Sequence, residues 1–364
     1  MHESKRKAFM QKIKGGVAIF PSALPANRTY DTEHKYRQDS NFYYLTGFEE
    51  PGAVCLIAPD HPEHHYVLFV RPREPEREVW TGKRAGVEGA KAHFGADEAY
   101  PIGEFDEKIS EYLAKADRLY YSFGSDEAFN RKIIDLFKRY SRHRIRNGTG
   151  PNTLIDSGEI LAEMRLIKNE EELRRIRRAT EISVEAHLAA MKAVRSGMYE
   201  YEVEALIDSI FRKSEGSYPA FPTIVAGGAN ATTLHYTANN CQIQDGDLVL
   251  IDAGCEYKYY NGDITRTFPA NGRFTETQRE VYQLVLDVQL AVIETIRPGV
   301  PIDEPNKKAI ELLTEGMIKL GLLEGEKEKL IEEEKHKKFY MHRVGHTLGL
   351  DVHDVNKTQE GETP

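Results

Sequence analysis

Apolar positions in the first part of the chain form short runs and helical repeats. Short apolar runs between polar turns are typical of buried strands, whereas apolar residues three or four positions apart are typical of helices. Strands are predicted at 17–20, 53–58 and 66–70, and helices at 105–113 and 128–140. This mixture indicates an α/β domain.

The second part of the chain begins with longer helical patterns. Asn169 is a good N-cap, and the acidic residues at 170–172 favour the first turn of a helix whose loose apolar stripe runs through 173–194. Thr275 and Gln278 form a capping-box signal for another long helix. Helices are also predicted at 203–211, 275–297 and 310–320, and a solvated helix or an insertion at 324–338.

Turn-forming residues at 147–152 (Asn-Gly-Thr-Gly-Pro-Asn) separate these two parts. The chain has 364 residues, which is too long for one ordinary domain and suits two. We therefore expect an N-terminal domain at 1–150 and a C-terminal domain at 151–364.

Charge and composition restrict the class of protein. Lys and Arg total 49 against 58 Asp and Glu, a formal net charge of -9, so nucleic acid is not an expected partner. The longest apolar run, 53–58, is far shorter than the roughly 20 residues that a membrane helix needs, so no membrane association is expected. The sparse cysteines Cys55, Cys241 and Cys255 fit a reducing compartment and predict a cytoplasmic protein.

Two aspartates stand at the ends of predicted strands in the second domain. Asp252 follows the apolar run 248–251, and Asp263 precedes the strand-like run 264–268. An acid at the end of a buried strand is costly unless it is paired or binds a metal. The two residues are therefore candidate metal ligands.

The pairing of these strands decides whether the carboxylates meet. A hairpin that turns at Tyr257–Lys258 would place Asp252 directly opposite Asp263, with Cβ atoms about 5 Å apart and able to share metal ions. The stronger local turn signal, Asn261–Gly262, would pair Asp252 with Asn271 and break the site. The spacing alone leaves both registers open.

Four histidines of the second domain stand in apolar or glycine-bearing contexts: His235, His342, His346 and His353. His342 and His346 have the spacing of a helical zinc pair, but the Glu of H-E-x-x-H is missing, and Gly345 and Gly349 disfavour a helix. A strand or loop is expected to present His346 and His353. One such histidine would usually be a core residue, whereas four of them near two strand acids indicate a catalytic or metal site.

Other chemistries find no support in the motifs. The chain lacks G-x-x-x-x-G-K-[ST], G-x-G-x-x-G and G-x-S-x-G patterns, so neither nucleotide binding nor a serine nucleophile elbow is indicated. The stretch 227–230 is best interpreted as a tight turn, and Cys255 as a half-buried strand residue.

Long segments in order along the chain resemble one family. They include YRQDSNFYYLTGFEEPGAV, EVWTGKR, YPAFPTIVAGGANATTLHY, DGDLVLIDAGCEYKYYNGDITRTFPANGRFT and FYMHRVGHTLGLDVHDV. With these segments the sequence resembles the bacterial Xaa-Pro aminopeptidases (aminopeptidase P), relatives of the proline dipeptidases. The resemblance implies an α/β N-terminal domain and an α+β "pita-bread" catalytic domain, in which helices cover a curved antiparallel sheet.

The resemblance also implies a site and its ligands. Asp252, Asp263 and His346 match residues that bind two divalent metal ions, usually manganese. His342 and His353 match catalytic histidines; His353 also matches a substrate-binding position, as His235 does. Thr265 is expected to orient Asp263. Trp80 matches a residue that can reach the substrate site of a neighbouring subunit, so a homo-oligomer acting on Xaa-Pro peptides is expected.

One departure from the family pattern concerns two glutamates, in a Glu-Pro-Gly and an Arg-x-Glu-Asp motif, which the family carries after the metal histidine. Neither motif is present, and Glu360 and Glu362 are not expected to replace them. We therefore expect a C-terminally incomplete copy that lacks the last strands of its sheet and is inactive by itself. The alternatives are a proline dipeptidase and a non-catalytic pita-bread binding module.

Overall fold

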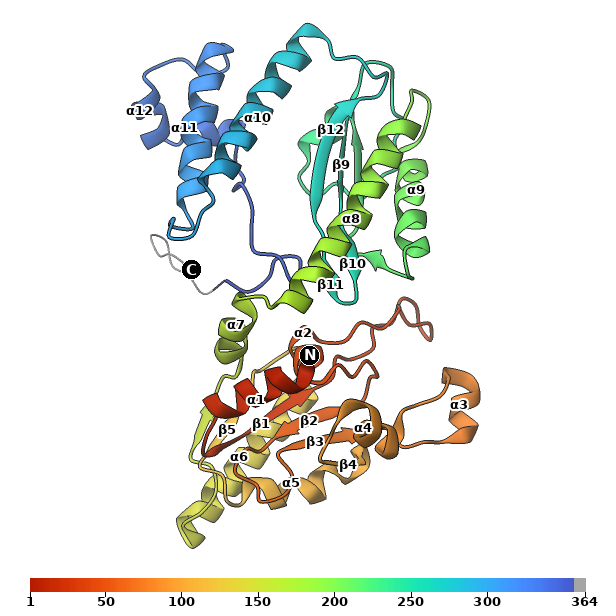
Figure 1. Ribbon diagram of the computed structural model, residues 1–364, viewed down its shortest axis with the longest axis vertical. Coiled ribbons are helices and arrows are strands. Elements are labelled where there is room, and N and C mark those ends of the chain that lie inside the picture. Colours follow the sequence, from red (N-terminus) through yellow and green to blue (C-terminus); the bar gives the residue numbers. More distant parts are fainter. Residues whose placement is uncertain (357–364) are drawn as a thin grey trace. The chain divides into compact units, whose positions relative to one another are not determined.

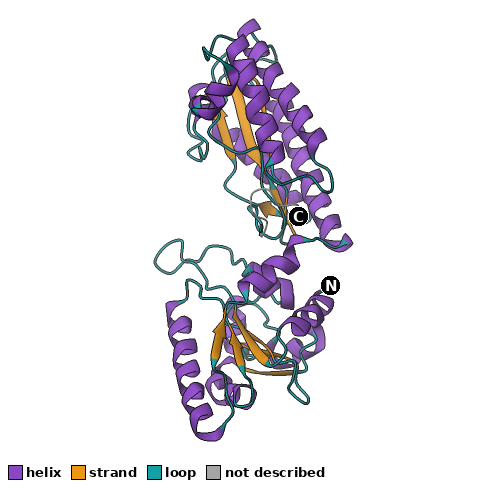
Figure 2. Ribbon diagram, turned by 90° about the vertical axis from the view of Figure 1, so that its left-hand side faces the viewer, coloured by secondary structure: helices purple, strands orange, loops and turns teal. Residues whose placement is uncertain are grey.

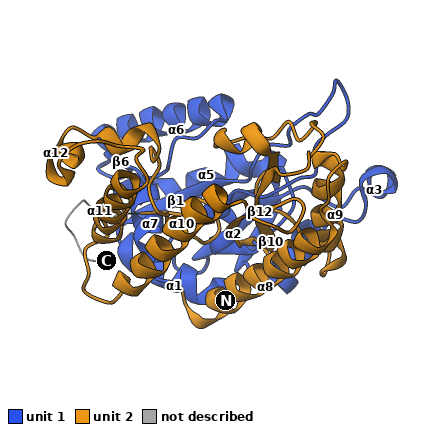
Figure 3. Cartoon of the chain, turned by 90° about the horizontal axis from the view of Figure 1, so that it is seen from above, with its two compact units in different colours: residues 1–167 blue, residues 168–364 orange. Residues whose placement is uncertain are grey.

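A computed structural model describes residues 1–356 and divides the chain into two compact units, Met1–Ile167 and Lys168–Pro364 (Figure 3). This division comes later than the boundary expected at residue 150. The reason is that β6 (Thr153–Ile155) pairs in parallel with β5 (Arg118–Tyr120) and completes the first sheet. Among the described residues, no helix has the length and apolar character needed to cross a membrane.

The first unit contains a six-stranded mixed sheet with the order β4-β3-β2-β1-β5-β6 (Figure 1). Its other strands are β1 (Gly16–Pro21), β2 (Val54–Ile57), β3 (Tyr66–Val70) and β4 (Glu98–Pro101). The strands predicted at 17–20, 53–58 and 66–70 are confirmed. Nearly every residue of β1, β2 and β3 is buried, as expected for a sheet covered on both faces.

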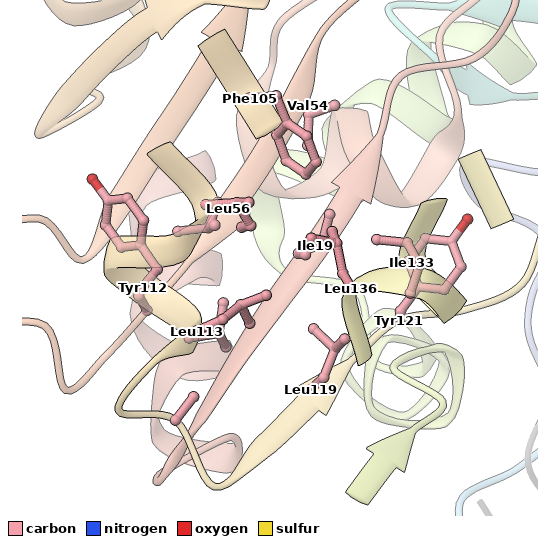
Figure 4. Packing of buried hydrophobic residues seen from close by; sticks show 14 of the residues in the cluster. Ile19, Val54, Leu56, Phe105, Tyr112, Leu113, Leu119, Tyr121, Ile133 and Leu136 are labelled. Atoms are coloured by element: carbon pink, nitrogen blue, oxygen red, sulfur yellow. The ribbon is translucent and has the colours of Figure 1, made fainter. Parts of the chain in front are cut away.

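Helices lie on both faces of this sheet (Figure 2). The helices of this unit are α1 (His2–Lys12), α2 (Ser40–Thr46), α3 (Pro75–Thr81), α4 (Gly86–Phe94), α5 (Phe105–Leu113), α6 (Glu127–Asn147) and α7 (Gly158–Leu166), with the 3-10 turn η1 (Ile102–Glu104); α3 has no buried residue. Figure 4 shows Leu113 of α5 and Leu136 of α6 packed with Ile19 and Leu56 of the sheet. Each such buried side chain contributes about 1.5–3 kcal/mol.

The second unit contains two small antiparallel sheets, with the orders β12-β9-β8 and β11-β10-β7. The strands are β7 (Tyr218–Pro219), β8 (Ile224–Gly227), β9 (Leu248–Ala253), β10 (Cys255–Tyr257), β11 (Tyr260–Asn261) and β12 (Ile264–Pro269). Burial alternates strictly along β9: Val249, Ile251 and Ala253 are buried in the core. Because side chains alternate between faces, Asp252 lies on the opposite face.

The helices α8 (Glu170–Ala193) and α9 (Glu200–Lys213) cover the buried face of the sheet that contains β9, and α10 (Glu276–Thr295) packs against α11 (Glu304–Lys319) in a separate cluster. The unit also contains α12 (Lys327–Glu332) and the 3-10 turns η2 (Gly228–Thr232) and η3 (Lys335–Lys338). The predicted N-cap Asn169 begins α8, where it forms a capping box with Glu172, and the predicted capping box of Thr275 and Gln278 begins α10. Ile182 of α8 and Phe211 of α9 join the core under β9, whereas Val288 and Ala309 join α10 to α11.

Candidate active site

The hairpin that carries the two aspartates differs in register from both sequence expectations. Asp252 lies directly opposite Thr265, so the predicted pairing of Asp252 with Asp263 is wrong, as is the alternative with Asn271. The chain turns at Lys258–Tyr259, whose φ angles of 48° and 72° suit a two-residue hairpin loop. This turn is one residue later than expected, and it shifts the pairing by two positions. Because a strand repeats every two residues, Asp263 stays on the same face as Thr265 and Asp252.

Asp252 is a carboxylate held in an unfavourable place. Its Oδ1 atom is buried and, in the structure, has no hydrogen-bond partner. Burial and then the negative charge of Asp263 raise the pKa of Asp252 to about 6, although the hydroxyl of Thr265 and the nearby rings of His235 and His346 act in the opposite direction. A cation beside the unpartnered oxygen would remove both penalties. The residues therefore fit a metal ion on an observation of the structure itself.

His346 meets Asp263 from a distant part of the chain. Its Nε2 lies 3.1 Å from Oδ2 of Asp263, and its Nδ1 lies 3.0 Å from the carbonyl oxygen of Thr347. A carbonyl can only accept, so Nδ1 carries a proton and donates it to Thr347, and Nε2 is the ring atom that faces Asp263. The ring of His353 stands edge-on to that of His346, with centroids 4.2 Å apart. The side chains of Asp252, Asp263, His346 and His353 thus bring carboxylate and imidazole groups together around one position, as metal coordination requires.

A buried asparagine connects the aspartate hairpin to the histidine loop, which we define as residues 346–354. Asn261 donates its backbone N–H to the carbonyl oxygen of Gly349 (3.0 Å) and its amide Nδ2 to the carbonyl oxygens of Gly349 (3.1 Å) and Leu350 (3.0 Å). The sequence analysis considered Asn261 only as part of the alternative turn and missed this role. Because the partners are 88 residues apart, no local signal could have revealed it.

An ion pair anchors the other end of the histidine loop. The ammonium of Lys168 lies 2.8 Å from Oδ2 of Asp354, and the Asp354 side chain is 1% exposed. The backbone N–H of Asp354 also donates to the carbonyl oxygen of Thr347, and this hydrogen bond closes the loop. His346 and His353 are therefore fixed from both sides.

The remaining predicted residues lie elsewhere. His235 is exposed on the segment after η2, near enough for its charge to affect Asp252. His342 is exposed, and its Nδ1 lies 2.8 Å from the carbonyl oxygen of Arg343 rather than against the aspartates. Trp80 is 88% exposed on α3 of the first unit. Glu360 and Glu362 lie outside the described residues.

Within the described residues, three ligand atoms all within 4.8 Å of one another occur at His61, His64 and Glu111, and not at the aspartate site. The Nδ1 of His61 accepts the backbone N–H of His64 (2.9 Å), so its proton sits on Nε2 and faces Glu111. In that tautomer the Nδ1 lone pair of His61 accepts a backbone hydrogen bond, and the proton on Nε2 leaves that atom no lone pair for a metal ion.

An apolar cavity of about 1080 Å³ lies between α10, α11 and the segment after η3, and His346 is on its wall. Its lining is mainly aliphatic, with Val285, Val288, Ile293 and Met317 among the contributors. Such a wall offers no carboxylate pair for metal chemistry. The candidate metal ligands Asp252 and Asp263 belong to the hairpin of β9 and β12.

Comparisons with known proteins identify the family of the chain. Residues 2–121 match the aminopeptidase P N-terminal domain, and residues 174–363 match metallopeptidase family M24. The Xaa-Pro aminopeptidase of Escherichia coli is 41% identical over 97% of this chain and 80% of that protein, and the enzyme of Haemophilus influenzae is 40% identical with the same coverage.

Solved structures show the same relation. An aminopeptidase of Pseudomonas aeruginosa superposes with a TM-score of 0.95 at 45% identity, over 99% of this chain and 82% of that one. A variant of Escherichia coli aminopeptidase P in complex with substrate gives a TM-score of 0.93 at 41% identity, over 98% and 81%. The expected combination of an aminopeptidase P N-terminal domain and a pita-bread domain is confirmed. The chain belongs to the Xaa-Pro aminopeptidases of metallopeptidase family M24.

Proposed function

We propose that this protein is a metal-dependent exopeptidase that hydrolyses the N-terminal residue from peptides with proline in the second position. Family membership gives the reaction class. The observation that carries the proposal is the contact of Asp263 with His346 beside the buried, unpartnered oxygen of Asp252. A binding module would gain nothing from a buried carboxylate held at such a cost.

Asp252, Asp263 and His346 would hold the metal. Carboxylate oxygens with one imidazole suit a hard or borderline divalent ion, and we propose two Mn²⁺ ions. When bound, such ions lower the pKa of a water molecule and polarise the scissile carbonyl. Thr265 was expected to orient Asp263; it lies directly opposite Asp252 on the neighbouring strand, and its hydroxyl is hydrogen-bonded to that carboxylate instead.

The histidines then act on the substrate. We assign to His353, whose ring lies edge-on to that of His346, the donation of an N–H to the oxygen on which charge develops, and we assign the same role to His342. His235 and His353 would contact the peptide on either side of the reacting bond. Removing one such donor typically costs about 10²- to 10³-fold in rate.

Trp80 supports an aminopeptidase rather than a dipeptidase. At 88% exposure it offers a large apolar ring to another molecule, and we propose that it reaches the substrate of a neighbouring subunit in a homo-oligomer. All three cysteines are free, which is consistent with a reducing compartment and with our proposal of a cytoplasmic protein.

The test compares the full-length protein with Asp263→Asn and with the exposed control Glu324→Gln. The unaltered protein and the control should retain Mn²⁺ after dialysis and release the first residue of Xaa-Pro-Xaa tripeptides. Asp263→Asn should lose both properties while its melting curve still shows a folded first unit. Retained metal and turnover in Asp263→Asn would refute the site, and faster cleavage of Xaa-Pro dipeptides would identify a proline dipeptidase.

A further inference from the structure

Glu200, the first residue of α9, is a fully buried carboxylate with no cation beside it among its described partners. Four groups donate hydrogen bonds to it instead. They are the backbone N–H of Gly227 (2.8 Å) and the amide of Asn230 (3.0 Å) at Oε1, and the hydroxyl of Tyr236 (2.7 Å) and the backbone N–H of Cys241 (2.9 Å) at Oε2.

These bonds keep the carboxylate ionised despite its burial. Burial alone would raise the pKa of Glu200, but the four donors outweigh it and hold the pKa below its usual value. The N-terminus of α9 adds a favourable field. Hydrogen bonds to a buried charge are each stronger than neutral ones, so the arrangement is rigid.

The four donors lie on both sides of His235 in the sequence. Gly227 and Asn230 precede this residue, and Tyr236 and Cys241 follow it. Asn230 also donates to the hydroxyl of Tyr236 (3.0 Å), so the two flanks are tied to each other as well as to Glu200. His235 itself is exposed, and its position is therefore determined by the segments that flank it.

We propose that Glu200 is a positioning residue that holds His235 over the aspartate face. The inference rests on the proposed function, because it gives His235 a substrate to contact. Glu200 touches neither metal nor peptide in this scheme. It acts by joining α9, the end of β8 and the segment 236–241 at one point.

Glu202 offers a matched control on the same turn of α9. It is exposed, and its carboxylate accepts the backbone N–H of Tyr199 (2.7 Å), which caps the helix. Its hydrogen bond therefore stabilises α9 without involving the flanks of His235. If Glu200 served only to begin the helix, the two residues would behave alike.

Glu200→Gln is the test variant, because it keeps the size of the side chain but turns one acceptor into a donor. In either orientation of the amide, the new NH₂ group would face a backbone N–H, that of Gly227 or that of Cys241, so two donors would meet. Hydrogen exchange at the Gly227 and Cys241 amides should accelerate at least tenfold in Glu200→Gln and stay within threefold of the parent in Glu202→Gln.

Kinetics with an Xaa-Pro-Xaa tripeptide test whether the hydrogen bonds to Glu200 position His235. Glu200→Gln and His235→Ala should lower kcat/KM with the same division between kcat and KM. The double variant should be no more than about threefold worse than His235→Ala alone, since residues that act together are not additive. Glu202→Gln should stay within twofold of the parent.

Two results would overturn the inference: faster exchange with unchanged kcat/KM, or losses that multiply in the double variant. Both leave the peptidase assignment intact. A full-length, metal-loaded protein that cleaves no Xaa-Pro peptide would instead refute the proposed function. The comparison of hydrogen exchange in Glu200→Gln and Glu202→Gln needs no turnover, so it would still test whether Glu200 holds the segments that flank His235.

Discussion

Replacing Asn261 with alanine should loosen the histidine loop without altering any residue that binds metal or substrate. The side chain of Asn261 is 1% exposed and donates Nδ2 to two carbonyl oxygens, those of Gly349 and Leu350. Asn261→Ala removes both bonds and keeps the backbone N–H that also reaches Gly349 (3.0 Å). The carbonyl of Leu350 then loses this donor beside a side chain that is 2% exposed.

The expected cost follows from these contacts. A protein hydrogen bond contributes about 0.5–1.5 kcal/mol net. Asn261→Ala removes two of them, those to Gly349 and Leu350, so a loss of about 2 kcal/mol in total is expected. At about 1.4 kcal/mol for each factor of ten, the loop should open roughly 30 times more often.

Hydrogen exchange measures this opening directly. The amide of Asp354 donates to Thr347 across the base of the loop (3.0 Å), and its exchange in the metal-free protein should accelerate roughly 30-fold. Asn271→Ala is the control, because it removes an exposed amide bond to Asp245 (2.9 Å) and should leave Asp354 unchanged. An Asp354 amide that exchanges within threefold of the parent in Asn261→Ala would refute the assigned role.

Two further substitutions test how the second unit is held together. Lys168→Met should destabilise the second unit by about 3–5 kcal/mol in urea denaturation, because it removes the ammonium beside the buried charge of Asp354. Adding Asp354→Asn should recover part of this loss. A double variant whose loss equals the sum of the two single losses would contradict the prediction. Gly254→Ala should abolish folding of the second unit in thermal melts, since its Cβ would lie 1.8 Å from the carbonyl oxygen of Gly262, whereas Gly103→Ala meets no atom within 4 Å and should melt like the parent.

The sequence by itself determined the elements whose signals are local. The N-caps Asn169 and Thr275 lie next to the helices that they begin, so α8 and α10 were predictable from a few neighbouring residues. The buried strands β1, β2 and β3 were equally clear, because a short apolar run has few alternatives. The candidate residues Asp252 and Asp263 were visible as acids at strand ends.

The tertiary structure decided the register of the aspartate hairpin. Local turn chemistry favours Asn261–Gly262, yet the chain turns at Lys258–Tyr259, where neither residue is a preferred turn former. Asn261 is instead buried and bonded to the histidine loop, which outweighs the local preference. The hydrogen bonds of Asn261 to residues far along the chain thus outweighed the turn preference of the Asn261–Gly262 dipeptide.

The same reason explains why the supporting residues of the site were not found. Asn261, Lys168 and Glu200 act on partners that lie far along the chain, and nothing in their own neighbourhood distinguishes them from turn, linker or helix residues. A side chain's role depends on what folding brings beside it. Residue type and spacing reveal which groups can do chemistry, whereas their support depends on contacts that exist only in three dimensions.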